Sequence, residues 1–139
     1  MNTYPILKPY IDKIDGMDQW VIAAIPGAKW AKKVFPNETK AKAIEKLWDA
    51  ILKAARVDDD PVKAWKEHNK NLADKCAKMN ELNFEYLEYT NSLGTKLTIE
   101  LAPTNIWLAG SEEARVSKIV FNPNMPTEEV FGMPKKDGV

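Results

Sequence analysis

Near its C-terminal end the sequence reads Phe121-Asn-Pro-Asn-Met-Pro-Thr-Glu-Glu-Val-Phe131. Two adjacent carboxylates, Glu128 and Glu129, stand here in a stiff frame of proline and apolar residues. Pro123 and Pro126 each fix φ and lack a backbone donor, which excludes a central strand or a helix interior. The motif therefore predicts a rigid turn that presents a carboxylate, and the preceding chain is expected to support it.

The residues after the second proline have the pattern of a short capped helix. Thr127 can accept a hydrogen bond from a backbone N–H two or three residues later, which would place Glu128 and Glu129 in the first turn. A carboxylate held in this way is preorganised for metal binding or general-base catalysis. The helix dipole alone also favours acids in a first turn, so an isolated Thr-Glu-Glu usually has only this structural role. The expected apolar anchors of the turn are Met125, Val130 and Phe131.

The composition argues against several classes of function. The chain has 139 residues, the size of one ordinary domain, and 45% of them are hydrophobic. Its formal net charge is zero, which argues against binding to nucleic acid or to an anionic membrane. No apolar run is long enough to span a bilayer. The N-terminal residues lack the apolar core of a signal peptide, and the single cysteine fits a reducing compartment, so we expect a cytoplasmic protein.

The histidine and cysteine content argues against a complete hydrolytic site. His68 is the only histidine, whereas catalytic metal sites and serine or cysteine nucleophiles usually require an imidazole at the site. A lone histidine beside the apolar face of a helix is more often structural than a ligand. Cys76 is expected to be a small buried hydrophobe rather than a nucleophile.

Residues 1–82 are predicted to be mainly helical. Asn37 or Thr39 can open a helix over Asn37–Ala55, in which apolar residues recur at three- and four-residue spacing. Asp60 and Pro61 are a good cap and first residue for a second long helix, Pro61–Leu82. A seam of seven-residue repeats on this second helix predicts packing against another helix, the first long helix being the expected partner. The seam residues are Val62, Trp65, Asn69, Leu72, Cys76 and Met79.

Residues 83–139 are predicted to be rich in strands, because the hydrophobic period changes to two after Leu82. Phe84–Tyr89 and Thr95–Leu101 should form an antiparallel hairpin around a turn at Asn91–Gly94. We therefore predict an α+β fold, with the two long helices antiparallel and packed on a mostly antiparallel sheet. Shorter elements are expected as strands at Trp20–Ile25, Ile106–Ala109 and Lys118–Phe121, as helices at Tyr10–Ile14 and Ala28–Phe35, and as a charged loop at Ser111–Ser117.

Several of these segments, in this order and with these approximate spacings, resemble one family. The segments are Trp30–Pro36, Asp60–Trp65 with His68, Leu72–Asn80, Tyr89–Thr90, Gly94–Thr98, Ile106–Trp107 and Asn124–Phe131 with Pro134. The chain resembles the metallo-aminopeptidases that include aminopeptidase T, aminopeptidase S and PepS. The sequence from Met125 to Phe131 is the most specific part of the resemblance.

The resemblance implies a cytoplasmic exopeptidase that removes N-terminal amino acids from peptides. It implies two divalent metal ions (Zn, Co, Mg or Mn), held by Glu, His and Asp side chains. Matching of the motif places a metal ligand at Glu128 or Glu129, and Glu128 is favoured. A homodimer is also expected, with peptides as substrates and no nucleic-acid or membrane partner.

The chain also departs from the family, whose members are much longer and have further metal ligands downstream of the motif. We therefore expect an internal piece, with 1–82 as the end of the first domain and 83–139 as the start of the metal-bearing domain. Its fold would be incomplete relative to the full enzyme. One or two carboxylates cannot hold two metals tightly, so the isolated chain should have no complete catalytic site and be inactive.

Two other readings remain open at this stage. The chain could be a stand-alone, non-catalytic α+β module that binds a peptide or partner protein at an exposed strand edge. It could also associate with another copy to cover apolar surface.

Overall fold

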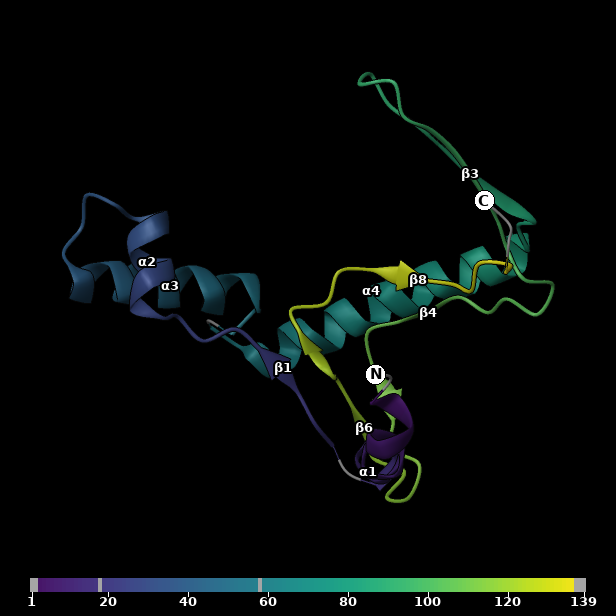
Figure 1. Ribbon diagram of the computed structural model, residues 1–139, viewed down its shortest axis with the longest axis horizontal. Coiled ribbons are helices and arrows are strands. Elements are labelled where there is room, and N and C mark those ends of the chain that lie inside the picture. Colours follow the sequence, from purple (N-terminus) through teal and green to yellow (C-terminus); the bar gives the residue numbers. More distant parts are fainter. Residues whose placement is uncertain (1–2, 18, 58, 137–139) are drawn as a thin grey trace. The chain divides into compact units, whose positions relative to one another are not determined.

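The structure, a computed structural model, describes residues 3–17, 19–57 and 59–136 and confirms a mixed α+β chain (Figure 1). The chain divides into two compact units, each assembled from separate stretches of sequence. Unit 1 contains Met1–Ala64 and Ser111–Thr127, and unit 2 contains Trp65–Gly110 and Glu128–Val139. The predicted boundary near residue 83 concerns the domains of a longer protein and stays a prediction. Among the described residues, no helix is long and apolar enough to cross a membrane.

In unit 1, the core lies between two helices, α2 (Ala28–Val34) and α3 (Lys40–Ala54). Ala31 of α2 and Ala43 of α3 are fully buried, and Leu47 packs with them. Two alanines at the contact let the helix backbones approach closely. The predicted cap is confirmed, because Thr39 accepts a hydrogen bond from the backbone N–H of Lys42 at 3.3 Å.

The helix that packs on α3 is therefore α2, whereas the sequence predicted the second long helix. That helix, α4 (Pro61–Leu82), has the predicted bounds, but most of it belongs to unit 2. Its pairing with α3 stays a prediction.

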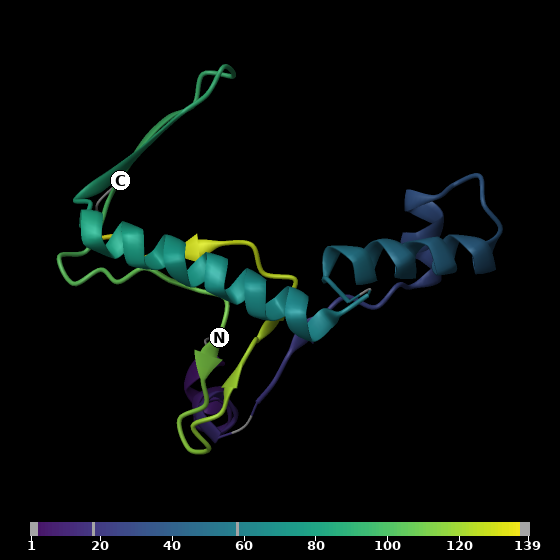
Figure 2. The same ribbon diagram turned by 180° about the vertical axis from the view of Figure 1, so that it is seen from behind.

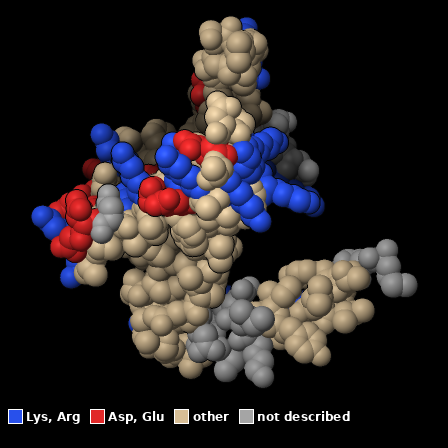
Figure 3. Space-filling model, turned by 90° about the vertical axis from the view of Figure 1, so that its left-hand side faces the viewer, with Lys and Arg blue, Asp and Glu red and all other residues tan. Residues whose placement is uncertain are grey.

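On α2 and α3, lysines outnumber acidic residues and both kinds gather on one face (Figure 3). The acidic side chains partly neutralise this face; Lys46 donates a hydrogen bond to Glu38, which lowers the pKa of that carboxyl.

The remaining elements of unit 1 are one helix and two short strand pairs. Helix α1 (Tyr4–Met17) is longer than predicted and includes Pro9. Strand β1 (Ile22–Ala23) pairs in parallel with β7 (Asn124–Met125). The strand predicted at Trp20–Ile25 is therefore present but limited to two residues, and both are exposed.

In the second strand pair of unit 1, one strand forms within the loop predicted at Ser111–Ser117 and the other within the strand predicted at Lys118–Phe121. Strand β5 (Glu112–Glu113) pairs antiparallel with β6 (Val120–Phe121), and the turn between them is closed by the N–H of Ala114 donating to the carbonyl of Ile119 at 3.0 Å. Backbone pairing thus makes a strand of Glu112 and Glu113 within the predicted loop, and both side chains are exposed.

In unit 2, α4 buries one side of its apolar seam against strands and loops. Cys76 packs with Leu101 and Trp107, and Met79 and Val130 border this cluster. The prediction that the seam packs on another helix is therefore wrong for these residues, because segments after residue 83 cover it. Val62, at the start of the seam, is 66% exposed.

The predicted hairpin is confirmed as β2 (Tyr86–Thr90) and β3 (Lys96–Glu100), paired antiparallel from Tyr86 opposite Glu100 to Thr90 opposite Lys96. The side chain of Asn91 accepts hydrogen bonds from two backbone N–H groups of the turn. Gly94 takes a φ of 92°, which a side chain would strain. Leu97 is 38% exposed and Leu101 is buried, so the apolar side chains of this segment are covered best at the base of the hairpin.

The last pair of strands lies along α4 in both views of unit 2 (Figures 1 and 2). Strand β4 (Leu108–Ala109) pairs antiparallel with β8 (Val130–Phe131). Asn80 of α4 fastens the chain just before β4: its amide donates to the carbonyl of Trp107 at 3.2 Å and accepts from the N–H of Trp107 at 2.8 Å. After β4, Gly110 takes a φ of 73° close to Leu72.

We predict that substitution of Gly110 by alanine destabilises the protein more than the same change at Gly94 or Gly27. A Cβ at Gly110 would lie 3.1 Å from Oδ1 of Asn69 and 3.2 Å from Cδ1 of Leu72, in addition to the strain of positive φ. We expect G110A to lower the free energy of unfolding by about 3 kcal/mol. Urea denaturation followed by tryptophan fluorescence measures it.

Two control glycines separate these causes. Gly94 has a positive φ with open space around it, so G94A should cost about 1 kcal/mol, and Gly27 has neither feature, so G27A should cost less. Equal effects of G110A and G94A would contradict the close packing of Gly110 against α4.

We also predict that Asn80 contributes more to stability than Asn71, another exposed asparagine on the same helix. N80A leaves the backbone N–H and C=O of Trp107 without their partner, at a cost of about 2 kcal/mol. The exposed Asn71 is the matched control, and N71A should change the free energy of unfolding by less than about 0.5 kcal/mol. A thermal denaturation series on both variants tests this difference, and equal midpoints would contradict it.

Candidate functional site

The motif at 121–131 folds differently from its sequence prediction. The structure shows no helix at Thr127–Phe131; these residues form an irregular segment that leads into β8. The prediction of a capped helical turn is therefore wrong. The reason is a non-local contact: the backbone of Val130 and Phe131 pairs with β4, so it cannot form the bonds of a helical turn. Thr127 is buried, and the Met125–Pro126 peptide bond is cis.

The anchoring of the motif agrees with the prediction in part. Val130 packs against the cluster of Cys76, Leu101 and Trp107, as expected of an anchor. Phe131 is 54% exposed, so its predicted role as a second anchor is wrong. The successive side chains of a strand point to opposite faces, and only one of these two can reach the core.

Glu128 lies beside the histidine of α4. Its Oε2 is 3.8 Å from Nε2 of His68, within the range of an ion pair if the imidazole is protonated. The two side chains differ in exposure, at 57% for Glu128 and 9% for His68. The imidazole also meets Trp65 edge-to-face, with ring centroids 5.7 Å apart and planes inclined by 83°. A buried, oriented imidazole thus borders an accessible carboxylate.

Glu129 has different surroundings. Its Oε2 accepts a hydrogen bond from the backbone N–H of Glu128 at 3.0 Å. This carboxylate therefore holds the local backbone, whereas that of Glu128 extends toward α4. The two adjacent acids are not equivalent, which the sequence alone could not establish.

The donor types at this site fit a divalent metal ion, although their number is small. Carboxylate and imidazole are common ligands of zinc and related metals, and the exposure of Glu128 leaves it accessible to an ion. However, the described residues contain no group of three or more histidine, cysteine, aspartate or glutamate side chains that could hold a metal. The part of the site in this chain is therefore a partial one.

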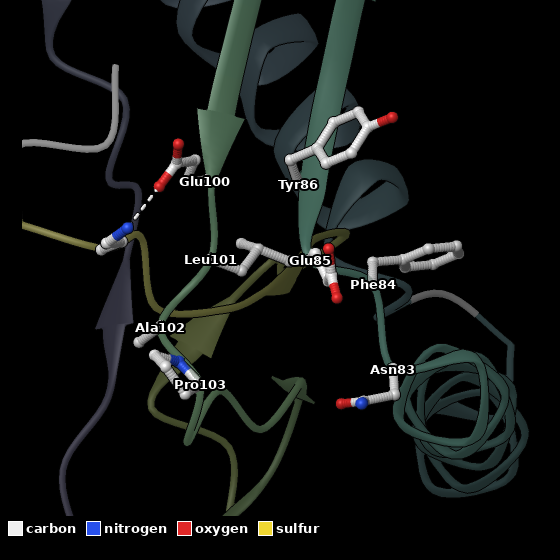
Figure 4. A pocket seen from close by; sticks show the side chains of 9 residues that line it. Asn83, Phe84, Glu85, Tyr86, Glu100, Leu101, Ala102 and Pro103 are labelled. Atoms are coloured by element: carbon white, nitrogen blue, oxygen red, sulfur yellow. Dashed lines mark hydrogen bonds and ion pairs between the residues drawn. The ribbon is translucent and has the colours of Figure 1, made fainter.

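A second candidate site is a cavity of about 470 Å³ at the base of the β2–β3 hairpin (Figure 4). Glu85, Leu101 and Pro103 are among the residues that line it, and at its rim Nζ of Lys135 binds Oε2 of Glu100 at 2.6 Å. Its polar lining side chains are all exposed. A binding site usually combines apolar walls with a few fixed polar groups, so the pair of Glu128 and His68 is the stronger candidate.

Cys76 is buried in the core of unit 2, as predicted. Burial raises the pKa of its thiol, because the thiolate would lose hydration. This combination is that of a structural cysteine rather than a nucleophile.

Comparison with known proteins supplies a context for the motif. Residues 3–139 match the family described as thermophilic metalloprotease (M29). The chain belongs to this family. Aminopeptidase AmpS of Bacillus subtilis is 45% identical over 142 residues, aminopeptidase 2 of Geobacillus stearothermophilus is 43% identical over 121, and aminopeptidase PepS of Streptococcus thermophilus is 47% identical over 118. These alignments cover 100%, 86% and 83% of this chain, respectively.

The same alignments cover much less of the relatives. The M29 chain spans only 32%, 29% and 28% of the lengths of AmpS, aminopeptidase 2 and PepS, in that order. The resemblance to aminopeptidases T, S and PepS is thus confirmed at the level of the family. The chain corresponds to about a third of such a protein.

We predict that Cys76 is protected from thiol reagents in the folded protein. The raised pKa lowers the fraction of reactive thiolate, and burial blocks access. Alkylation by iodoacetamide at pH 8, measured by mass spectrometry, should be at least about 10-fold slower than in denaturant. Because the thiol ionises more readily in the unfolded chain, stability should fall as pH rises through the usual thiol range. Equal alkylation rates in folded and denatured protein would contradict the buried placement.

Proposed function

We propose that this chain is part of a cytoplasmic, dinuclear metal-dependent aminopeptidase that removes N-terminal amino acids from peptides. The observation that carries the proposal is the position of Glu128, in the segment most specific to the family and beside the imidazole of His68. Membership of a metalloprotease family and relatives named as aminopeptidases support the reaction class. Peptide substrates and a homodimer belong to the same proposal.

In this proposal Glu128 is a metal ligand and Glu129 stabilises the irregular segment that presents it. A bound pair of divalent ions would supply an activated water, polarise the scissile carbonyl and receive the free amino group of the substrate. Zn, Co, Mg and Mn are all compatible with carboxylate ligands. A carboxylate would suit such ions because its oxygens are hard, negatively charged donors.

The isolated region should be inactive on its own. Among the described residues, the carboxylate of Glu128 and the imidazole of His68 meet at the motif, and no group of three or more such side chains could hold a metal. So few donors hold a divalent ion weakly, because each ligand must replace hydration of the ion. The remaining ligands would come from other parts of a longer protein.

The alternative function is a non-catalytic module that binds a peptide or partner protein. One observation favours it: the β2–β3 hairpin carries Leu93, 92% exposed, at its turn, and Tyr89, 48% exposed, on β2. Such a ribbon could pair with an added strand. Peptide binding by the isolated chain, without metal, would support this alternative over the peptidase.

We predict that Glu128 contributes more than Glu129 to activity and metal binding in the native-length protein. E128Q should lower kcat for an N-terminal aminoacyl substrate by at least about 100-fold, because it removes a metal ligand, whereas E129Q should lower it less. Metal content measured by elemental analysis should fall in E128Q. The adjacent exposed pair Glu112 and Glu113 offers matched controls, and E112Q and E113Q should retain activity and metal.

Two outcomes would contradict the proposal. One is full, metal-dependent activity of E128Q. The other is metal-dependent release of N-terminal residues by the isolated 139-residue chain, which would require a complete site within it.

A further inference from the structure

We propose that His68 is a positioning residue that fixes the carboxylate of Glu128 for metal binding. The inference rests on the proposed function, since it concerns how one of the proposed ligands is held. It assigns a role to the only histidine of the chain, which the sequence suggested to be structural.

The position of the imidazole is well defined. His68 lies on α4 one turn after Trp65, which is itself 8% exposed, and the two rings meet edge-to-face. Because 9% of the His68 side chain is exposed, its packing restricts the rotamers available. Its Nε2 faces Oε2 of Glu128 at 3.8 Å. The imidazole ring is thus held by the core of unit 2.

Such a constraint matters for Glu128 because 57% of its side chain is exposed, and ordering an exposed side chain on metal binding costs conformational entropy. A contact from a fixed Nε2–H to one oxygen would limit these rotamers and direct the other oxygen toward the ion. The 3.8 Å between Nε2 of His68 and Oε2 of Glu128 is longer than a hydrogen bond. A small rotation of the exposed glutamate side chain would bring the two atoms within hydrogen-bond distance.

Positioning explains the geometry better than ligation by His68. A metal on Nε2 would need several further donors around it. The burial of the imidazole restricts the approach of such donors. The exposed carboxylate of Glu128 meets no such restriction. Hydrogen bonding to a ligating carboxylate is a common way to orient it.

The test measures binding of Co²⁺ to the metal-free native-length protein, by calorimetry and by the visible absorption of the bound ion. H68L removes the donor while keeping an apolar side chain, and should weaken Co²⁺ binding about 10- to 100-fold and alter the absorption spectrum. H68Q places an amide N–H near the position of Nε2, and should restore most of the affinity and the wild-type spectrum. A glutamine is a poor metal ligand, so this rescue distinguishes positioning from ligation.

Gly94 provides the control for stability. It lies at the turn of the β2–β3 hairpin with a positive φ and open space around it, so G94A should lower the thermal midpoint without changing Co²⁺ affinity. If H68L does not fold, H68N replaces it: its shorter amide cannot reach Glu128, so H68N should bind Co²⁺ more weakly than H68Q.

Three outcomes would overturn the inference. Wild-type affinity and spectrum in H68L, or in H68N when it stands in, would show that Glu128 needs no positioning. If H68Q loses as much Co²⁺ affinity as H68L, or as H68N when it stands in, His68 would be assigned as a ligand. E128Q measured in parallel separates these results from failure of the proposed function: unchanged Co²⁺ affinity in E128Q, or no binding by the unsubstituted protein, overturns both proposals.

Discussion

The antiparallel pairing of Val130–Phe131 with Leu108–Ala109 is the contact on which the candidate site depends. It determines which side of β8 faces α4, so Val130 enters the cluster of Cys76, Leu101 and Trp107. Because Glu128 lies two residues before this anchored position, it is brought next to His68. A shift of the register by one residue would turn Val130 away from the core and displace the carboxylate as well.

Helix α4 serves as the rigid support for this arrangement. The same helix buries Cys76 against the strands and fastens the chain before β4 through Asn80. It also carries His68, held against Trp65. The helix that packs the core of unit 2 therefore also carries the proposed positioning residue. The imidazole is held in place without the ordering of a further segment. In the proposed function, the other metal ligands would come from elsewhere in a longer protein.

The sequence predicted those parts of the fold that depend on local signals. The bounds of α4 follow from the cap at Asp60 and from Pro61, and the β2–β3 hairpin follows from Asn91 and Gly94. Local signals also produced the main error, the helix at Thr127, where pairing with a distant strand prevails. The contact of His68 with Glu128 joins residues far apart in the sequence, so no spacing rule could predict it. Family resemblance identified the motif, and the structure distinguishes its two acids.

Native mass spectrometry of the protein purified from its source cells tests the central claim most directly, because it reports chain length and bound metal together. The account predicts a polypeptide that extends beyond Val139 and retains two divalent ions per chain. Removal of the ions by a chelator should lower the mass accordingly and abolish aminopeptidase activity in the same sample. A native chain that ends at Val139 and carries no metal would contradict the account and favour a binding module.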